Sequence, residues 1–167
     1  MEITLDQLLA SRDSRSALQR ELLQQHPGLT LVCLTVVMPG KVKRNFHSLI
    51  VAQAALSEVL NAFEGLTELV RTRDLPTGFE AYLLTTVERT EAKRLTCRIE
   101  DTHPLGRLFD LDVMDADGMP LSRTELGFAP RRCLVCDQEA RHCMRLGAHT
   151  QDEIHAKIKQ MIDQYVQ

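Results

Sequence analysis

The sequence has 167 residues, of which 44% are apolar and 26% charged, and its formal net charge is −3 at pH 7. This balance is typical of one globular domain, and together with an aromatic content of only 4% it argues against a nucleic-acid-binding protein. No apolar run approaches the ~20 residues of a membrane span, and the first residues do not resemble a signal peptide. We therefore expect a cytoplasmic protein that does not contact a membrane.

Two helices are expected in residues 4–26. Thr4 and then Asp13 or Ser14 are typical N-cap residues, and each precedes apolar residues at helical spacing. The dipeptide Pro27-Gly28 predicts where the second helix ends.

Strands and a long helix are expected in the next sixty residues. The continuous apolar run 29–38 predicts a strand that is buried on both faces. Residues 45–63 predict a helix, and residues 65–73 and 78–87 predict two further strands. The helix is expected to bury one stripe of apolar residues, formed by Phe46, Leu49, Ile50, Leu56, Val59, Leu60 and Phe63.

The second half of the chain predicts one more hairpin and a C-terminal helix. Residues 88–103 are ambiguous between helix and strand, and their composition favours a helix. Residues 108–114 predict a strand, followed by an Asp117-Gly118 turn and a return strand in 119–123 at a sheet edge. We therefore expect an α+β fold with a mixed or antiparallel sheet of about five strands packed by helices. A cysteine-rich loop should precede the last helix, which starts near Thr150.

Asp110 and Asp112 are acids within an apolar strand. Because side chains alternate along a strand, both carboxylates should point to the same face as Leu108 and Met114, with Cβ atoms roughly 6 to 7 Å apart. Two carboxylates so placed suit a divalent cation such as Mg²⁺ at the floor of a pocket. The alternative is a strand whose polar face is open to solvent.

Three residues before this strand are candidates for the same site. Gly106 could let a phosphate approach the backbone, and Arg107 could bind it with a guanidinium fork. His103 could deprotonate a hydroxyl or donate to a phosphate, and the alternative is a loop histidine bonded to backbone. Four further arginines are either solvated charges or ligands of a polyanionic substrate, namely Arg12, Arg15, Arg131 and Arg132.

Cys133, Cys136, Cys143 and His149 offer three thiolates and an imidazole within 17 residues. Such a set could close tetrahedrally around Zn²⁺, with His142 as an alternative to His149. Four protein ligands would leave no open coordination position, so the metal would be structural. Reduced, partly buried thiols are the other interpretation, with redox or catalytic use as a third, and the odd total of five cysteines argues against a disulfide framework.

Five segments together resemble one known family. They are LLASRDSR, LTVVMPG, HPLGRLFDLDV, LSR and PRRCLVCDQEARHCMRLGAH, in this order along the chain. At these spacings they resemble the apo-citrate lyase phosphoribosyl-dephospho-CoA transferases, also called citrate lyase holo-acyl-carrier-protein synthases. The resemblance runs along essentially the whole chain, so residues 1–167 would form a single transferase domain.

The resemblance implies a nucleotidyltransferase-type reaction. The donor would be 2'-(5''-triphosphoribosyl)-3'-dephospho-CoA, and the acceptor a serine of the apo-citrate lyase acyl carrier (gamma) subunit. Pyrophosphate would be released. Such a reaction needs acids that hold Mg²⁺ and cations that neutralise the leaving group. The rival function is a non-catalytic, zinc-stabilised module that binds an acyl carrier protein or the citrate lyase complex.

On this basis we assign hypothetical roles to the candidate residues. Asp110 and Asp112 would hold Mg²⁺, Arg107 would bind the triphosphate, and His103 would activate the carrier serine. Arg12, Arg15, Arg131 and Arg132 are additional phosphate-binding candidates. The well-known nucleotidyltransferase fold has a Gly-Ser or Gly-Gly pair about a dozen residues before its D-x-D, whereas residues 95–102 contain no glycine. The metal roles therefore rest on chemical analogy.

Overall fold

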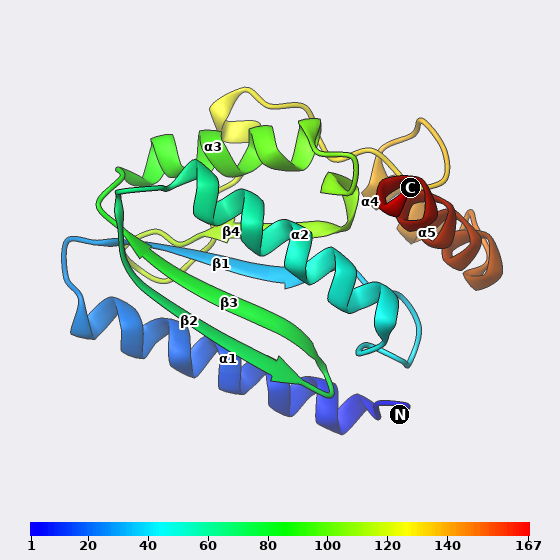
Figure 1. The fold of residues 1–167 in the computed structure, drawn as a ribbon, viewed down its shortest axis with the longest axis horizontal. Helices are drawn as coiled ribbons and strands as arrows, with labels where there is room; N and C mark the ends of the chain where they lie inside the picture. The colour runs from blue at the N-terminus through cyan, green and yellow to red at the C-terminus, as the bar shows by residue number, and fades with distance from the viewer.

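The computed structural model describes residues 1–167 as a four-stranded antiparallel sheet with five α-helices (Figure 1). The strands lie in the order β2-β3-β1-β4 and comprise β1 (Thr30–Val36), β2 (Thr67–Leu75), β3 (Gly78–Thr85) and β4 (Phe109–Val113). Helix α2 (Phe46–Ala62) connects β1 to β2, and α3 (Arg89–Thr102) connects β3 to β4. This is the β-α-β-β-α-β arrangement of ferredoxin-like folds.

Helices cover both faces of the sheet. Helices α2 and α3 lie on one face, and α1 (Leu5–Gln25) lies along the other (Figure 1). The larger apolar core is formed by the sheet with α2, α3 and α5 (Gln151–Val166), and the smaller core by the sheet with α1. The two faces of the sheet therefore cover apolar cores of different size, and the smaller core lies under α1.

Helix α1 is continuous, so the prediction of two helices in residues 4–26 was wrong. Thr4 caps its start through a reciprocal capping box with Gln7. Asp13 and Ser14 are exposed within the helix, and no glycine or proline interrupts the chain before Pro27. A good N-cap residue contributes only about 1 kcal/mol, which does not offset the main-chain hydrogen bonds that a break would remove.

Helix α2 was predicted correctly, but its buried face was predicted only in part. Phe46 is 75% exposed, and Leu49 and Leu60 are also exposed. The face that packs on the sheet is made mainly of small residues and valines, namely Ser48, Val51, Ala52, Ala54, Ala55 and Val59. Small side chains let the helix approach the sheet closely. The prediction considered only large apolar residues and therefore missed this face.

The sheet has four strands rather than about five, because the segment after β4 does not form a strand. It makes one bridge, between Met114 and Pro120, and two backbone hydrogen bonds across the turn, from Leu121 N to Val113 O at 2.8 Å and from Asp115 N to Met119 O at 2.7 Å. Pro120 has no N–H group with which to extend the ladder. The helix favoured for residues 88–103 is present as α3, and Glu88 caps it by accepting from Thr90 N.

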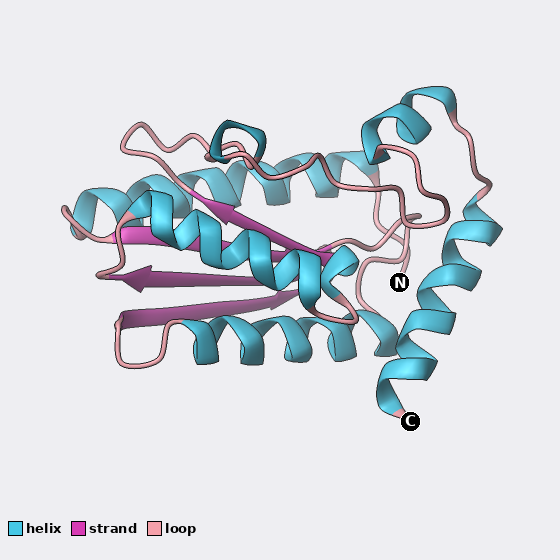
Figure 2. Cartoon of the chain, turned by 90° about the horizontal axis from the view of Figure 1, so that it is seen from above, coloured by secondary structure: helices cyan, strands magenta, loops and turns pink.

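The C-terminal part crosses one end of the sheet (Figure 2). Short 3₁₀ turns lie at Gly106–Leu108 and Thr124–Leu126, and α4 (Ala140–Leu146) follows the cysteine-rich loop. Thr150 caps α5 as predicted. None of the helices is both long and apolar enough to span a membrane.

Candidate functional site

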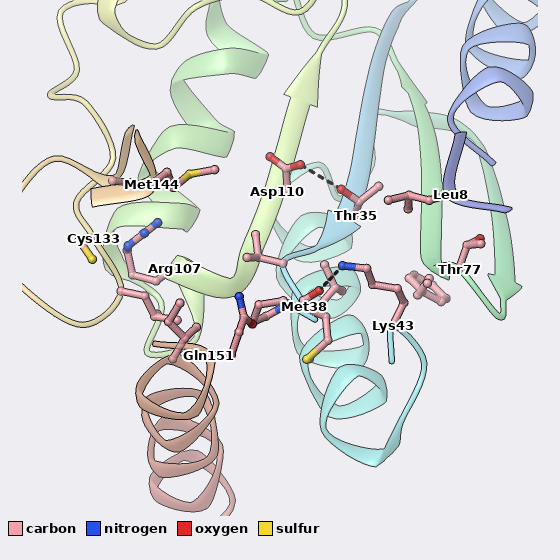
Figure 3. Close-up of a pocket in the computed structure, with 18 of the residues that line it drawn as sticks. Leu8, Thr35, Met38, Lys43, Thr77, Arg107, Asp110, Cys133, Met144 and Gln151 are labelled. Atoms are coloured by element: carbon pink, nitrogen blue, oxygen red, sulfur yellow. Dashed lines mark hydrogen bonds between the residues drawn. The ribbon is translucent and has the colours of Figure 1, made fainter. Parts of the chain in front are cut away.

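A cavity of about 640 Å³ lies under the N-terminal half of α1. Its floor comes from one end of β1, β3 and β4, and its far wall comes from the cysteine-rich segment 133–149 and the start of α5 (Figure 3). This volume is in the range of small-molecule binding sites. The cavity is lined by segments that are distant in sequence, so no single motif could predict which residues line it.

Asp110 lies on the cavity floor. The alternation along β4 sends Phe109, Leu111 and Val113 into the larger core and leaves Asp110 and Asp112 half-buried on the α1 side. Met114 shares the acidic face as predicted, whereas Leu108 precedes the strand in a 3₁₀ turn and packs in the larger core.

The two acids differ in their surroundings. Thr35 Oγ1 donates to Asp110 Oδ2 at 3.0 Å, and Arg131 Nη1 lies 3.9 Å from Asp110 Oδ1. Asp112 pairs with Cys33 across the sheet and lies outside the cavity lining. Burial raises the pKa of Asp112, and the neighbouring charge of Asp110 raises it further. A cation between the two carboxylates would relieve this repulsion.

A second carboxylate of the cavity is already neutralised. Glu80 Oε2 accepts from Arg73 Nε at 2.9 Å and from the Tyr82 hydroxyl, and Arg15 Nε lies 3.9 Å from Oε1. Burial and the Glu80 carboxylate raise the pKa of Tyr82, which keeps the phenol protonated as a donor. The sequence does not show this network, because Arg73 reaches Glu80 through the β2-β3 register and Arg15 reaches it from α1.

Three cationic side chains line the cavity, and they are Arg15, Lys43 and Arg107. The Arg107 Nε atom is buried without a hydrogen-bond partner. Burial and the neighbouring charge of Arg131 together lower the pKa of Arg107 to about 10. Lys43 had no predicted role, since nothing in its local sequence shows that its loop returns to the cavity.

The other predicted arginines lie outside the cavity lining. Arg131 holds the start of β4, because its Nη2 donates to Gly106 O at 3.1 Å and to Arg107 O at 3.2 Å. Arg12 and Arg132 are exposed. Arg15 and Arg107 therefore line the same cavity as Asp110. Arg131 lies next to Asp110 but outside the cavity lining, and Arg12 and Arg132 are on the surface.

Gly106 and His103 also lie outside the cavity lining. A Cβ atom at Gly106 would be 2.2 Å from Glu100 O, so this glycine lets the chain pack against the end of α3. The His103 ring packs on Phe109 and Tyr165, with centroid separations of 4.8 and 5.4 Å. Its Nδ1 accepts from Leu105 N at 3.0 Å, and burial lowers its pKa.

The cysteine cluster is assembled as the spacing predicts. The ligand atoms of Cys133, Cys136, Cys143 and His149 all lie within 4.8 Å of one another, and the set could hold a metal ion. Cys136 Sγ is 3.4 Å from Cys143 Sγ and 3.3 Å from His149 Nε2. The alternative ligand His142 is exposed and outside the cluster. All the ligands except Cys136 also line the cavity.

A family model and two named relatives that match this chain carry the same description. Residues 3–165 match the family model described as apo-citrate lyase phosphoribosyl-dephospho-CoA transferase. A Vibrio cholerae protein named "Probable apo-citrate lyase phosphoribosyl-dephospho-CoA transferase" is 36% identical over 99% of this chain and 94% of its own length. A Streptococcus pyogenes protein of the same name is 32% identical, over 98% of this chain and 87% of its own.

A longer relative matches as well. The chain is 39% identical to the Haemophilus influenzae protein named "Protein CitXG" over 96% of this chain, and it spans only 35% of that protein's length. The matched region thus accounts for most of the two shorter relatives and for about a third of the longer one. The chain belongs to the apo-citrate lyase phosphoribosyl-dephospho-CoA transferase family.

Proposed function

We propose that residues 1–167 form one transferase domain that attaches the phosphoribosyl-dephospho-CoA group to a serine of the acyl carrier (gamma) subunit of apo-citrate lyase. The donor is the triphosphoribosyl form of dephospho-CoA, and the second product is pyrophosphate. Family membership supports the reaction, and one observation carries the site: a cavity of ligand size that is lined by Asp110 and by the cations Arg15, Lys43 and Arg107. No observation favours the non-catalytic carrier-binding module.

The reaction is a phosphoryl transfer of the nucleotidyltransferase type. The serine oxygen forms a bond to the phosphorus next to the ribose, the bond from that phosphorus to the leaving pyrophosphate breaks, and the serine proton is lost to solvent. Negative charge develops on the leaving group, so cations must meet it there. Arg107 is suited to this, because its guanidinium is half-buried and its Nε has no protein partner.

We assign Asp110 and Asp112 to Mg²⁺. The ion would neutralise donor phosphate charge when bound. Thr35 orients Asp110 by donating to Oδ2, and Oδ1 lies 3.9 Å from Arg131 Nη1. Burial and then the neighbouring charge of Asp110 raise the pKa of Asp112. The like charges on one strand face support the assignment, since a cation would offset their repulsion.

For His103 the observations favour a supporting role rather than activation of the carrier serine. Its ring packs on Phe109, and its Nδ1 accepts from Leu105 N. Both contacts hold the segment that leads into Arg107 and Asp110. Arg131 has a similar role through its bonds to the carbonyls of Gly106 and Arg107.

We propose Zn²⁺ as the metal of the cysteine cluster. Three thiolates and one imidazole are a donor set that tetrahedral Zn²⁺ prefers, and four protein ligands make the site structural. Between Met114 and Ile158 the one buried residue is Cys143, so this segment has no apolar core of its own. A metal is the usual substitute for such a core. Protein purified without added zinc should contain about one zinc per chain, and substoichiometric zinc in folded protein would favour plain thiols.

The transfer reaction can be tested directly. The protein is incubated with apo-carrier, the triphosphoribosyl donor and Mg²⁺, and the intact carrier mass and released pyrophosphate are measured. The proposal requires a mass gain of one prosthetic group and an equal amount of pyrophosphate. Carrier that binds to the protein but gains no mass at saturating donor would instead support the binding module.

A further inference from the structure

Lys43 and Arg107 are cavity cations that form no ion pair with an acid. Arg15, the third cation of the lining, lies 3.9 Å from Glu80. Four further arginines have carboxylate partners, in the pairs Arg73–Glu80, Arg44–Asp74, Arg123–Asp101 and Arg131–Glu100. Lys43 and Arg107 are therefore the two cavity cations whose positive charge is not compensated by an acidic side chain of the protein.

Lys43 is positioned by the loop that follows β1. Its Nζ donates to Met38 O at 2.7 Å, which uses one of the three donors of the ammonium group. The side chain is half-buried, and burial lowers its pKa. The remaining donors are thus available in the cavity rather than in bulk water.

Arg107 approaches the same space from the other side. In Figure 3 Arg107 comes from the segment before β4 and Lys43 from the segment after β1, and Asp110 lies between them in the view. The Arg107 Nε atom is buried without a partner. A half-buried cation without a counter-charge costs desolvation energy, and a bound anion can offset that cost.

We propose that Lys43 and Arg107 form a subsite for a diphosphate anion, the terminal diphosphate of the donor that departs as pyrophosphate. A guanidinium fork and an ammonium group are the side chains that best match phosphate oxygens. This inference rests on the proposed function and adds Lys43 to its site. When the phosphorus–oxygen bond breaks, its electron pair remains on the pyrophosphate oxygen, and the positive charges of Lys43 and Arg107 would compensate the charge of the leaving group.

The subsite is tested with inorganic pyrophosphate, which needs neither carrier nor donor. Binding is measured by titration calorimetry, with and without Mg²⁺, for the wild type, Lys43→Gln and the matched control Lys41→Gln. Lys41 is two residues away, exposed, and 3.8 Å from Glu2. We expect the control to bind like the wild type and Lys43→Gln to bind roughly tenfold more weakly or worse. Lys43→Arg should recover most of the affinity.

Each outcome separates the subsite from the proposed reaction. Equal pyrophosphate affinity of Lys43→Gln and the wild type, with unchanged thermal unfolding, would overturn the subsite even if transfer proceeds. Wild type that binds no pyrophosphate under either condition would overturn it as well. Pyrophosphate binding that depends on Lys43, without any carrier mass gain, would keep the subsite and remove the transferase reaction.

Discussion

The Thr35 hydroxyl on β1 donates a hydrogen bond of 3.0 Å to Asp110 Oδ2 on the adjacent strand β4. The two residues are direct partners in the antiparallel register. One carboxylate oxygen is thereby fixed by the sheet, while the other lies 3.9 Å from Arg131 Nη1. The rigid strand pair thus sets the direction of the acid that we assign to Mg²⁺.

Replacement of Thr35 by Val should therefore reduce transfer more than it reduces stability. Val keeps the shape of Thr but removes the donor, so Asp110 would lose its fixed orientation. We expect kcat/KM to fall roughly tenfold and the free energy of unfolding to fall by about 1 kcal/mol. Thr35→Ser keeps the hydroxyl and serves as the control. Equal kcat/KM for Thr35→Val and the wild type would contradict the orienting role.

Replacement of Gly106 by Ala should destabilise the protein. The new Cβ would lie 2.2 Å from Glu100 O, a backbone atom that cannot rotate away. Overpacking of this kind costs about 1–3 kcal/mol. The strain would also displace Arg107, so pyrophosphate affinity should fall with stability. Unchanged midpoints in urea unfolding would show that the chain relaxes around the added methyl group.

The pH dependence of stability should contain a contribution from His103. Burial lowers the His103 pKa below its usual value of 6.5, so the folded protein binds fewer protons there than the unfolded chain. This stabilisation is present above pH 6.5 and is lost as pH falls through the lower folded pKa. His103→Gln should therefore flatten the fall in unfolding free energy as pH decreases below 6.5, and His142→Gln, at an exposed histidine, serves as the control.

The same pair of variants tests the supporting role of His103. If His103 only holds residues 105–109, His103→Gln should retain measurable transfer under conditions where it is folded, with the shape of the pH–rate profile unchanged. Loss of the acidic limb of that profile would instead identify His103 as the group that activates the serine.

Thiol reactivity should report the state of the cysteine cluster. Burial raises the pKa of Cys33 to about 12 and also raises that of Cys97, so both should resist thiol reagents in the folded protein. With metal bound no thiol should react rapidly, three should react after chelation, and all five after denaturation. Three rapidly reacting thiols in untreated protein that contains stoichiometric zinc would contradict the metal site.

Local sequence patterns predicted most of the elements, because their causes are local. The apolar run of β1 and the Thr150 cap of α5 are each set by neighbouring residues. The cysteine cluster was also accessible, since its ligands lie in one short segment. The continuity of α1 was missed, because good capping residues such as Asp13 do not end a helix without a helix breaker.

The composition of the cavity depends on long-range packing, and the sequence did not show it. Asp110 was found because two acids in an apolar strand are conspicuous. Lys43 and the Arg73–Glu80 pair were missed, because they reach the site through a loop conformation and a strand register. Gly106 was noticed for its chemistry, whereas the structure shows that it accommodates the carbonyl of Glu100.

The central claim is that Asp110 and Asp112 hold a divalent cation on which transfer depends. The most direct measurement is Mn²⁺ binding, followed by electron paramagnetic resonance as a substitute for Mg²⁺, in the wild type and in Asp110→Asn and Asp112→Asn, with Asp115→Asn as the control. We predict one tight site in the wild type and the control, its loss in the first two variants, and a parallel loss of carrier modification. Unchanged Mn²⁺ affinity and carrier modification in both variants would contradict the claim.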